Sequence, residues 1–214
     1  MNIEITSFPV APLGCTCSIL KDKITGETIV VDPGGEGPKI IALLEEKGCR
    51  VRYIIHTHAH FDHVLGTHDV ANHCRSRNQT PDVRLHPGDQ FLYKMLAKQC
   101  GWFGLPPAQP IEVMADMSDN EEFSFGGHKL TVLHTPGHTP GSCSFHLANE
   151  GILFSGDTLF AGGIGRTDLP GGDYSQIMTS IKERLLTLDE GTTVIPGHGD
   201  FTRIFEEKQL NPFL

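Results

Sequence analysis

Short runs of apolar and β-branched residues, separated by polar or glycine-rich stretches, recur along the first quarter of the chain. Four of these runs have the length and composition of β-strands, namely residues 3–10, 14–20, 27–31 and 51–55. The polar segment 21–26 predicts a hairpin turn between the second and third runs. Apolar residues at helical spacing then predict a helix over residues 39–47, which ends at Gly48.

The rest of the chain repeats this mixture of strands and helices. Apolar residues at helical spacing predict helices over residues 64–77 and 90–100. Residues 101–110, with their prolines and glycines, predict an irregular loop. Further strands are predicted at residues 83–85, in hairpins between 121 and 147 that include 130–133, and at 151–155 and 192–195. Strand pairs with intervening helices therefore occur in both halves of the chain.

The composition is that of an ordinary globular protein with one substantial core. The chain has 214 residues, of which 38% are hydrophobic and 20% are charged, so we expect a single domain over residues 1–214. The amino terminus has neither a basic start nor an apolar segment, and no apolar run is long enough to cross a bilayer. We therefore expect a cytoplasmic protein that does not bind membranes.

The net charge limits the kinds of binding partner, and the spacing of the cysteines indicates the redox state of their thiols. The net charge is −9, from 17 Lys and Arg against 26 Asp and Glu, so there is no overall basic field to hold nucleic acid or an anionic membrane. The six cysteines show no compact framework, and Cys15 and Cys17 are poorly placed to pair with each other on a predicted strand. We expect reduced and mostly buried thiols.

A cluster of histidines directly follows the predicted strand 51–55. The sequence there is His-Thr-His-Ala-His-Phe-Asp-His over residues 56–63. Residues two apart at the end of a strand point the same way, so His58 and His60 can converge on one metal ion. Asp62 and His63 are adjacent and lie beyond the regular alternation, so they can turn toward a second ion. The alternative is a histidine-rich surface loop.

Three later strands also end in residues of ligand type. Strand 130–133 leads into a glycine- and proline-rich loop around His138, strand 151–155 ends at Asp157, and strand 192–195 ends at His198. A fold that gathers strand ends along one edge would bring seven candidate ligands together: His58, His60, Asp62, His63, His138, Asp157 and His198. Any one of the last three, taken alone, would more often be structural.

The order of these motifs resembles that of the metallo-β-lactamase superfamily, and the resemblance covers nearly the whole chain. It implies an α/β fold, a four-layer αββα sandwich of two similar halves with the metal site at one edge between two mixed sheets. Carried over position by position, it implies a first metal on His58, His60 and His138. It implies a second metal on Asp62, His63 and His198, with Asp157 bridging the two.

The resemblance also assigns a supporting role to Asp32, which matches the aspartate that orients the histidine loop through hydrogen bonds. The alternative for Asp32 is a residue that simply forms the turn at the end of strand 27–31. The remaining histidines of the chain have no match to the metal pattern, and we interpret them as structural or surface residues.

Ligand identity narrows the choice within the superfamily. The antibiotic-hydrolysing members place cysteine, or no metal ligand, where Asp157 stands, and they are exported; flavodiiron proteins carry glutamate where this chain has His60. The segments 156–168 and 211–214 are similar to the short glyoxalase-II-like hydrolases. Those enzymes hydrolyse hydroxyacylglutathione thioesters such as S-D-lactoylglutathione, the thioester formed in methylglyoxal detoxification. Full-length glyoxalase II carries an added helical glutathione-binding domain, which we do not expect here because the chain ends soon after His198.

Persulfide dioxygenase is the main alternative. That family also has a Gly-Arg-Thr-Asp segment, and it uses one iron held by the equivalents of His58, His138 and Asp157. We favour the hydrolase because a single-iron enzyme has no need of His198, in its Gly-His-Gly setting, as a ligand of a second ion. A third reading is a metal-binding protein without catalysis.

The resemblance implies two divalent metal ions, zinc above all, with iron or manganese as alternatives. It further implies a metal-bridging hydroxide as the nucleophile, with Asp62 and Asp157 taking part in catalysis. Two ions, two carboxylates and one hydroxide leave about one net positive charge, which favours an anionic thioester. Arg166 either holds a substrate carboxylate or pairs with Asp168. Residues 90–110 either form a wall of the site along the thiol portion or only pack against the core. The acyl preference and the oligomeric state stay open.

Overall fold

The computed structural model describes residues 2–108 and 115–214. The first half of this described chain forms a mixed six-stranded sheet, the N-terminal sheet, whose strands follow one another in sequence order. Its strands are β1 (Ile3–Val10), β2 (Cys15–Asp22), β3 (Glu27–Val31), β4 (Arg50–Ile55), β5 (Asp82–Leu85) and β6 (Ala115–Asp116). The pairs from β1 to β3 are antiparallel, and those from β3 to β6 are parallel. The predicted strands of this half are confirmed, with β2 reaching two residues further than expected.

The second half forms another mixed six-stranded sheet, the C-terminal sheet, in the order β14-β13-β10-β9-β8-β7. Its strands are β7 (Glu122–Phe125), β8 (His128–His134), β9 (Cys143–Leu147), β10 (Ile152–Gly156), β13 (Thr193–Pro196) and β14 (Thr202–Arg203). Only the pair β10–β13 is parallel. A small hairpin of β11 (Leu159–Phe160) and β12 (Gly163–Ile164) stands apart from this sheet.

The inner faces of the two sheets pack against each other and form the main core. The alternation of β7 shows how the sequence specifies this packing, because Phe123 and Phe125 are buried while Glu122 and Ser124 face outward. The core includes Leu20, Ile29, Val31, Ile55, Met117, Phe123, Phe125, Leu130, Val132, Phe145, Leu147, Phe154 and Ile195. Burying apolar area of this extent is the dominant stabilising term for a sandwich.

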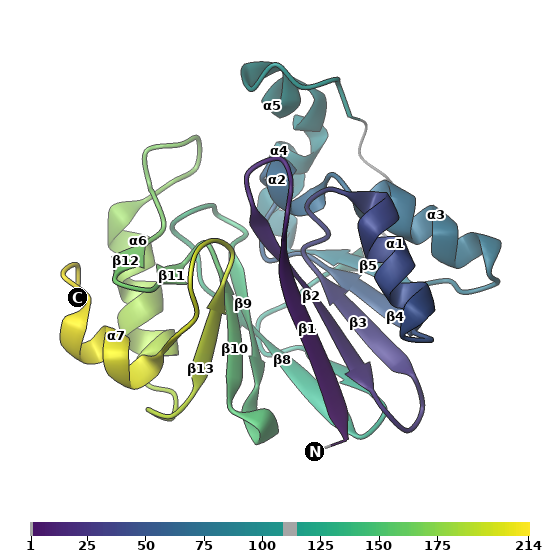
Figure 1. Cartoon of the computed structure of the whole chain (residues 1–214). Helices are drawn as coiled ribbons and strands as arrows, with labels where there is room; N and C mark the ends of the chain where they lie inside the picture. The colour runs from purple at the N-terminus through teal and green to yellow at the C-terminus, as the bar shows by residue number, and fades with distance from the viewer. Residues whose placement is uncertain (1, 109–114) are drawn as a thin grey trace.

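Helices cover the outer face of each sheet, which gives the predicted four-layer αββα arrangement (Figure 1). Helices α1 (Gly37–Glu46) and α3 (Thr67–Ser76) pack on the N-terminal sheet. The C-terminal sheet is covered by α6 (Tyr174–Ser180), by the π-helical segment Ile181–Leu185 that continues it, and by α7 (Ile204–Leu210). No helix of the described residues is long and apolar enough to cross a membrane.

Two predicted helices are each divided in the structure. The helix expected over 64–77 is present over 67–76 as α3, but its first expected residue, Val64, ends a separate short helix, α2 (Phe61–Val64), and Gly66 lies between the two. The amide of Gly66 donates to the carbonyl of Pro33 at 2.8 Å, and a Cβ on Gly66 would lie 2.8 Å from that same oxygen. This close tertiary contact separates α2 from α3.

The helix expected over 90–100 is likewise divided, into α4 (Gln90–Lys94) and α5 (Leu96–Trp102). It follows a 3₁₀ turn at Pro87–Asp89. The loop predicted over 101–110 therefore begins two residues later than expected, and its residues 109 and 110 lie outside the described part of the chain. Helices α4 and α5 form a cap at the edge where β4, β8, β10 and β13 end (Figure 1).

Candidate metal centre

The histidine loop changes backbone conformation halfway along its length. His60 is extended, with φ −68° and ψ 145°, and α2 begins directly after it at Phe61. Residues 58 and 60 therefore project as at a strand end, whereas Asp62 and His63 project from the first turn of a helix. This change of direction lets six consecutive residues serve two separate groups of ligand atoms.

The first group consists of His58, His60 and His138. His60 Nδ1 lies 3.0 Å from His58 Nε2 and 2.9 Å from His138 Nε2. One ring nitrogen can share a proton with only one of two neighbouring nitrogens, so hydrogen bonding among the three rings does not satisfy them all. Tetrahedral zinc would hold such nitrogens about 3.3 Å apart. The convergence of three nitrogens is thus suited to a metal ion.

The second group consists of Asp62, His63 and His198. His198 Nε2 lies 3.3 Å from His63 Nε2 and 3.2 Å from Asp62 Oδ2, and His63 Nε2 lies 3.8 Å from that same oxygen. All three donor atoms lie within 4.8 Å of one another, as those of the first group do. A mixed set of imidazole and carboxylate ligands suits zinc, iron and manganese.

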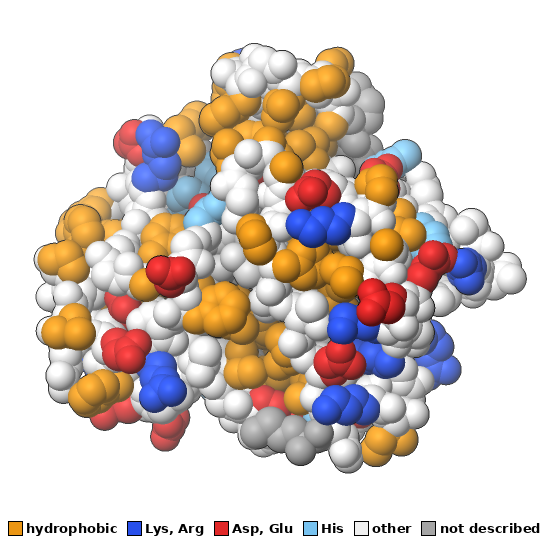
Figure 2. All heavy atoms as spheres, in the orientation of Figure 1, with side chains coloured by type: hydrophobic (Ala, Val, Ile, Leu, Met, Phe, Trp, Pro, Cys, Tyr) orange, Lys and Arg blue, Asp and Glu red, His pale blue; other side chains and the backbone are white. Residues whose placement is uncertain are grey.

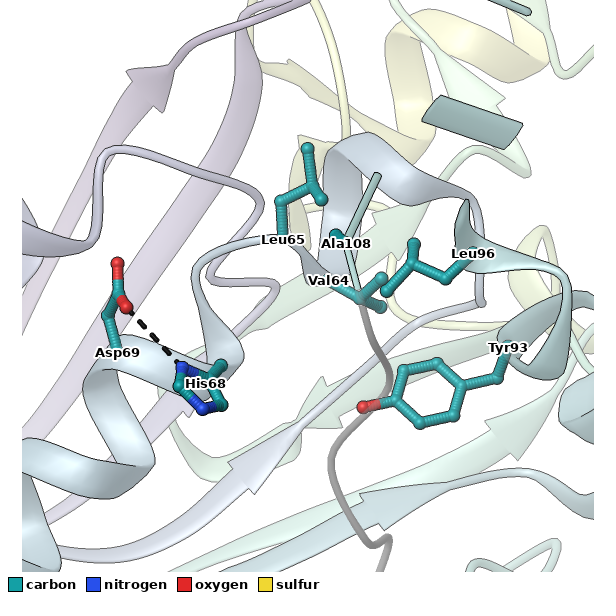
Figure 3. A pocket seen from close by; sticks show the side chains of 7 residues that line it. All are labelled: Val64, Leu65, His68, Asp69, Tyr93, Leu96 and Ala108. Carbon is teal, nitrogen blue, oxygen red and sulfur yellow. Dashed lines mark ion pairs between the residues drawn. The ribbon is translucent and has the colours of Figure 1, made fainter. Parts of the chain in front are cut away.

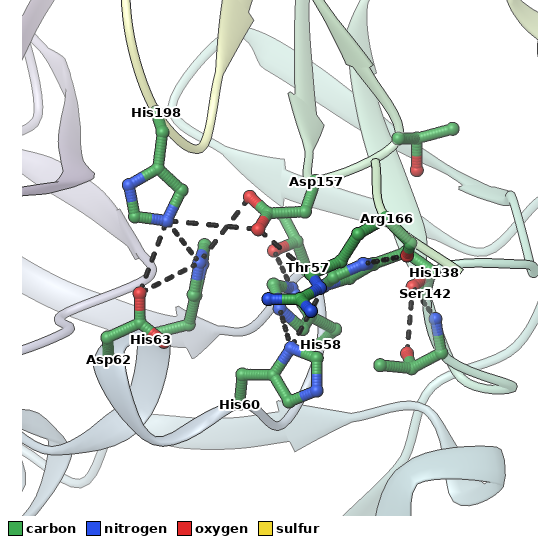
Figure 4. A network of polar contacts seen from close by, with 12 residues as sticks. Thr57, His58, His60, Asp62, His63, His138, Ser142, Asp157, Arg166 and His198 are labelled. Atoms are coloured by element: carbon green, nitrogen blue, oxygen red, sulfur yellow. Dashed lines mark hydrogen bonds and ion pairs between the residues drawn. The ribbon is translucent and has the colours of Figure 1, made fainter. Parts of the chain in front are cut away.

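Asp157 lies between the two groups, as Figure 4 shows. Its Oδ1 is 3.5 Å from His63 Nε2, while its Oδ2 is 3.6 Å from His138 Nε2 and 3.8 Å from His198 Nε2. Oδ1 is buried and has no hydrogen-bond partner among the described residues. A buried carboxylate oxygen left in this way is costly unless a cation meets it, so the residues present fit a divalent ion beside Asp157.

Glycine at position 197 is required for this approach. A Cβ there would collide with Asp157 Oδ1 and would lie 2.9 Å from His63 Cε1. The backbone of Gly197 is held on both sides, because its amide donates to Gly156 at 2.8 Å and its carbonyl accepts from Thr16 at 2.7 Å. The loop that carries His198 is therefore fixed to both sheets.

The electrostatics of the two groups differ. Burial holds the pKa of His58 well below its usual range and lowers the pKa of His60 to about 3, so both rings are neutral, the form that binds metals. Burial alone would raise the pKa of Asp62, but the adjacent His63 and His198 bring it down to about 2. The second group therefore contains an ionised carboxylate that attracts positive charge.

Asp32 lies beneath the histidine loop and contacts it at three points. Its Oδ1 accepts from the Thr57 amide at 2.7 Å, and its Oδ2 accepts from Thr57 Oγ1 at 2.6 Å. Oδ2 also lies 3.0 Å from His63 Nδ1, on the far side of the ring from the ligand nitrogen. Asp32 has a positive φ of 47°, a conformation that aspartate tolerates better than most residues. Through these contacts Asp32 holds Thr57 and the ring of His63 in place.

Arg166 lies at the edge of the site and makes two kinds of contact. Its guanidinium forms a two-point pair with Asp168, with both N–O distances at 2.7 Å, and this pair is exposed. Its backbone carbonyl accepts from His138 Nδ1 at 2.8 Å. The pairing alternative of the sequence prediction is thus present, and the peptide group of Arg166 additionally orients His138, which the sequence did not suggest.

Three further residues that support the site were missed by sequence reasoning. Cys15 Sγ lies 3.3 Å from His63 Nδ1, and burial raises the pKa of this thiol to about 12. Asp89 is fully buried and accepts from the amide of Ala59 at 2.9 Å. Gln99 of α5 donates to the carbonyl of Ala59 and accepts from the amide of Phe61, both at 3.1 Å. No local signal marks these residues, because each acts through a tertiary contact.

The cap formed by α4 and α5 has an apolar surface beside the site. Phe103, which is 55% exposed, packs on Phe61 with ring centroids 4.6 Å apart, and Trp102 and Phe91 are also exposed. Figure 2 shows hydrophobic side chains over this cap and histidine side chains reaching the surface beside it. The pocket of Figure 3 lies between this cap and helices α2 and α3, and contains none of the seven candidate ligands; it is lined by Val64, Leu65, His68, Asp69, Tyr93, Leu96 and Ala108.

Comparison with known proteins identifies relatives over nearly the full length. Residues 10–198 match the sequence model of the metallo-β-lactamase superfamily. Hydroxyacylglutathione hydrolase GloC of Haemophilus influenzae is 37% identical over 217 residues, which cover 100% of this chain and 98% of GloC. The chain is thus similar to GloC from end to end.

Solved structures give the same family. BLEG-1, described as a B3 metallo-β-lactamase, has a TM-score of 0.87 at 32% identity and covers 98% of this chain and 99% of its own. TTHA1623 in a di-iron-bound form has a TM-score of 0.86 at 35% identity, covering 98% and 100%. ETHE1 from Myxococcus xanthus has a TM-score of 0.77 at 26% identity, covering 98% and 83%.

These matches confirm the family that the motif order suggested, and with it the αββα fold. Because the family model covers most of the chain and GloC matches it throughout, the assignment does not depend on one motif. The chain belongs to the metallo-β-lactamase superfamily.

Proposed function

We propose that this protein is a thioesterase of the glyoxalase II type, which hydrolyses a glutathione thioester such as S-D-lactoylglutathione with two divalent metal ions. The observation that carries the proposal is the position of Asp157, whose carboxylate lies within 3.5–3.8 Å of His138 in the first group and of His63 and His198 in the second. A carboxylate so placed can bridge two ions. The hydrolase GloC, 37% identical over the full chain, supports the choice of substrate class.

The proposed ligands divide between the ions as the two groups do. His58, His60 and His138 would hold the first ion, and Asp62, His63 and His198 would hold the second. Zinc is the metal we expect, with iron or manganese as alternatives; the di-iron form of TTHA1623 is a relevant precedent among the structural neighbours. When bound, the ions supply a hydroxide nucleophile near neutral pH and polarise the thioester carbonyl.

The residues of the chain would then position the reacting groups. Asp157 lies beside both ligand groups and Asp62 lies in the second, so their oxygens could accept a hydrogen bond from the attacking nucleophile. Asp32 holds His63 and Thr57 through contacts of 2.6–3.0 Å, which fixes the direction of the histidine loop. A thiolate leaves readily, so the reaction needs no strong general acid at the sulfur.

Substrate contacts outside the centre would come from two exposed features. Arg166 carries a guanidinium at the edge of the site, and a substrate carboxylate could replace Asp168 as its partner. The apolar cap of α4 and α5 would lie along the thiol portion through partly exposed contacts. A cytoplasmic location and a role in methylglyoxal detoxification belong to the same proposal.

A persulfide dioxygenase is the alternative function, because the three residues expected to hold its iron, His58, His138 and Asp157, also lie close together, with His138 Nε2 3.6 Å from Asp157 Oδ2. The second group of ligand atoms argues against this function, because His198 Nε2 lies within 3.3 Å of both His63 Nε2 and Asp62 Oδ2. A mononuclear iron site on His58, His138 and Asp157 would leave this group without a role. The name of BLEG-1 does not favour antibiotic hydrolysis, because one fold carries unrelated activities.

Parallel assays of the purified protein test the proposal. We expect release of free thiol from S-D-lactoylglutathione at the same rate with and without dissolved oxygen, and no oxygen uptake with glutathione persulfide. Oxygen consumption that requires the persulfide, together with negligible thioester hydrolysis, would replace the proposed function with the alternative.

A further inference from the structure

Asp89 occupies the N-cap position of α4, but its side chain does not cap this helix. It is the residue that precedes α4, where a carboxylate ordinarily accepts from amides of the first helical turn. Here the side chain makes no such capping hydrogen bond. The carboxylate is instead turned away from its own helix and is fully buried. Its hydrogen bonds therefore go to other elements.

Those elements are the two loops that carry the first group of candidate ligands. Asp89 Oδ2 accepts from the Ala59 amide at 2.9 Å, between His58 and His60. The same oxygen accepts from Thr139 Oγ1 at 2.8 Å, directly after His138. Its other oxygen accepts from the Gly141 amide at 2.7 Å. One carboxylate thus joins a loop of the N-terminal sheet to a loop of the C-terminal sheet.

The backbone around Asp89 is packed closely enough to make this junction rigid. A Cβ on Gly88 would lie 2.9 Å from the carbonyl oxygen of Pro140, and a Cβ on Gly141 would lie 2.6 Å from the Asp89 amide. Within the described residues, Asp89 has no Lys, Arg or His partner in an ion pair. The burial of a carboxylate without a paired cation is costly, and its three hydrogen bonds offset that cost.

We propose that Asp89 is a positioning residue, which sets the spacing of the ring nitrogens of His58, His60 and His138 by tying their two loops together. The inference rests on the proposed two-ion centre, in which these three histidines hold the first ion. The closest contact between rings of the two loops is that of His60 Nδ1 with His138 Nε2, at 2.9 Å. These are the same two loops that the hydrogen bonds of Asp89 join. Outer partners of metal ligands typically change metal affinity by 10–100-fold.

The test compares Asp89→Asn with a matched control, Asp22→Asn. Asparagine keeps the shape but puts an NH₂ group where one of the donors needs an acceptor, so at least one of the three hydrogen bonds is lost. Asp22 is also buried; its Oδ1 accepts three hydrogen bonds, from Ile24 and Thr25, and its Oδ2 lies 3.3 Å from His128 Nε2, a contact that Asp22→Asn would change. It lies at the far end of β2, roughly 23 Å along the strand from Cys15.

Two readouts separate positioning from general stability. Zinc affinity is measured by competition with a chelator, and exchange of the Ala59 and Gly141 amides is measured by NMR in the metal-free protein. We expect Asp89→Asn to lower the affinity for one of two ions by about 10–100-fold and to speed exchange at both amides. We expect Asp22→Asn to leave both readouts at the parent values, even where its free energy of unfolding falls as much.

Parent affinity in Asp89→Asn, or an equal loss of affinity in Asp22→Asn, would overturn the inference. The two proposals fail in different experiments. Binding of only one ion by the parent would refute the two-ion centre. Unchanged amide exchange in Asp89→Asn would refute the role of Asp89 in joining the two loops.

Discussion

At the scale of single residues, the site depends on close contacts that few residue types could make. Gly197 leaves room for Asp157 Oδ1, and Asp32 adopts a left-handed backbone while holding His63. Such residues act by where they put a neighbouring atom. Substitution should therefore change metal binding and substrate binding separately, according to which contact is removed.

Asp157→Ala and Arg166→Ala should differ in kind. The first removes a carboxylate that faces both ligand groups, so we expect loss of bound metal and a fall in kcat of at least about 100-fold. The second should keep the metals and mainly raise KM, provided that Arg166 binds substrate. Elemental analysis and steady-state kinetics measure both effects.

Asp168→Ala is the matched control, since it frees the Arg166 guanidinium from its partner. If the pair is only structural, both variants will leave KM unchanged. Metal-replete Asp157→Ala enzyme with a kcat near that of the parent would contradict the bridging role of Asp157.

A second prediction concerns acid stability and His86, which stacks on His134 with centroids 4.0 Å apart. Burial, and then His134, lower the pKa of His86 to about 4. The unfolded chain binds this proton near pH 6.5, so the free energy of unfolding falls as the pH drops from about 6.5 to about 4. Because His86 is only half-buried, we expect a loss of about 1 kcal/mol.

His86→Gln should reduce this loss, because the replacement binds no proton in either state. Urea unfolding followed by circular dichroism at pH 7 and pH 5 measures the difference between parent and variant. All other titrating groups are shared by the two proteins, so an identical pH dependence in both would show that His86 does not contribute.

At the scale of elements, strands could be predicted from the sequence better than helices. The alternation of β7 and the apolar run of β4 are local signals, and the structure contains both strands. The division between α2 and α3 was not predictable, because it follows from the approach of Gly66 to Pro33. Helix α6 received no prediction because it depends on packing against the C-terminal sheet.

The same distinction applies to the candidate site. The seven candidate ligands could be found because strand ends and ligand residue types are visible in the sequence, and the structure brings all of them together. Asp89 and Gln99 could not, because their partners in the histidine loop, Ala59 and Phe61, lie 30 or more residues away in the chain. Their role depends on how two loops meet, which no local pattern encodes.

The cap of α4 and α5 leads to a prediction about the thiol portion of the substrate. Its contacts are partly exposed, so a thioester of a small thiol should keep kcat/KM within about 100-fold of the glutathione thioester. Phe103→Ala, which removes the ring that packs on Phe61, should lower kcat/KM for the glutathione thioester more than for the small one.

Ile24→Ala is a suitable control, because Ile24 is an exposed apolar residue in the β2–β3 turn, away from the cap. A loss of many thousandfold with the small thiol would require a tight, dedicated glutathione pocket. That result would refute the cap as a loosely contacting wall.

At the scale of the whole molecule, the site is an outcome of joining two sheets. The first half of the chain contributes His58, His60, Asp62 and His63, and the second half contributes His138, Asp157 and His198. Neither half of the chain contains all three ligands of either group. The packed core between the sheets therefore brings the halves of both ligand groups into contact, which links stability of the sandwich to metal binding.

The most direct test of the account is the number of metal ions in metal-replete protein, measured by elemental analysis against protein concentration. We expect about two ions per chain, because six donor residues form two groups with Asp157 between them. Chelation should abolish thioester hydrolysis, and added zinc should restore it. One tightly bound iron per chain, unchanged by excess metal, would contradict the two-ion centre.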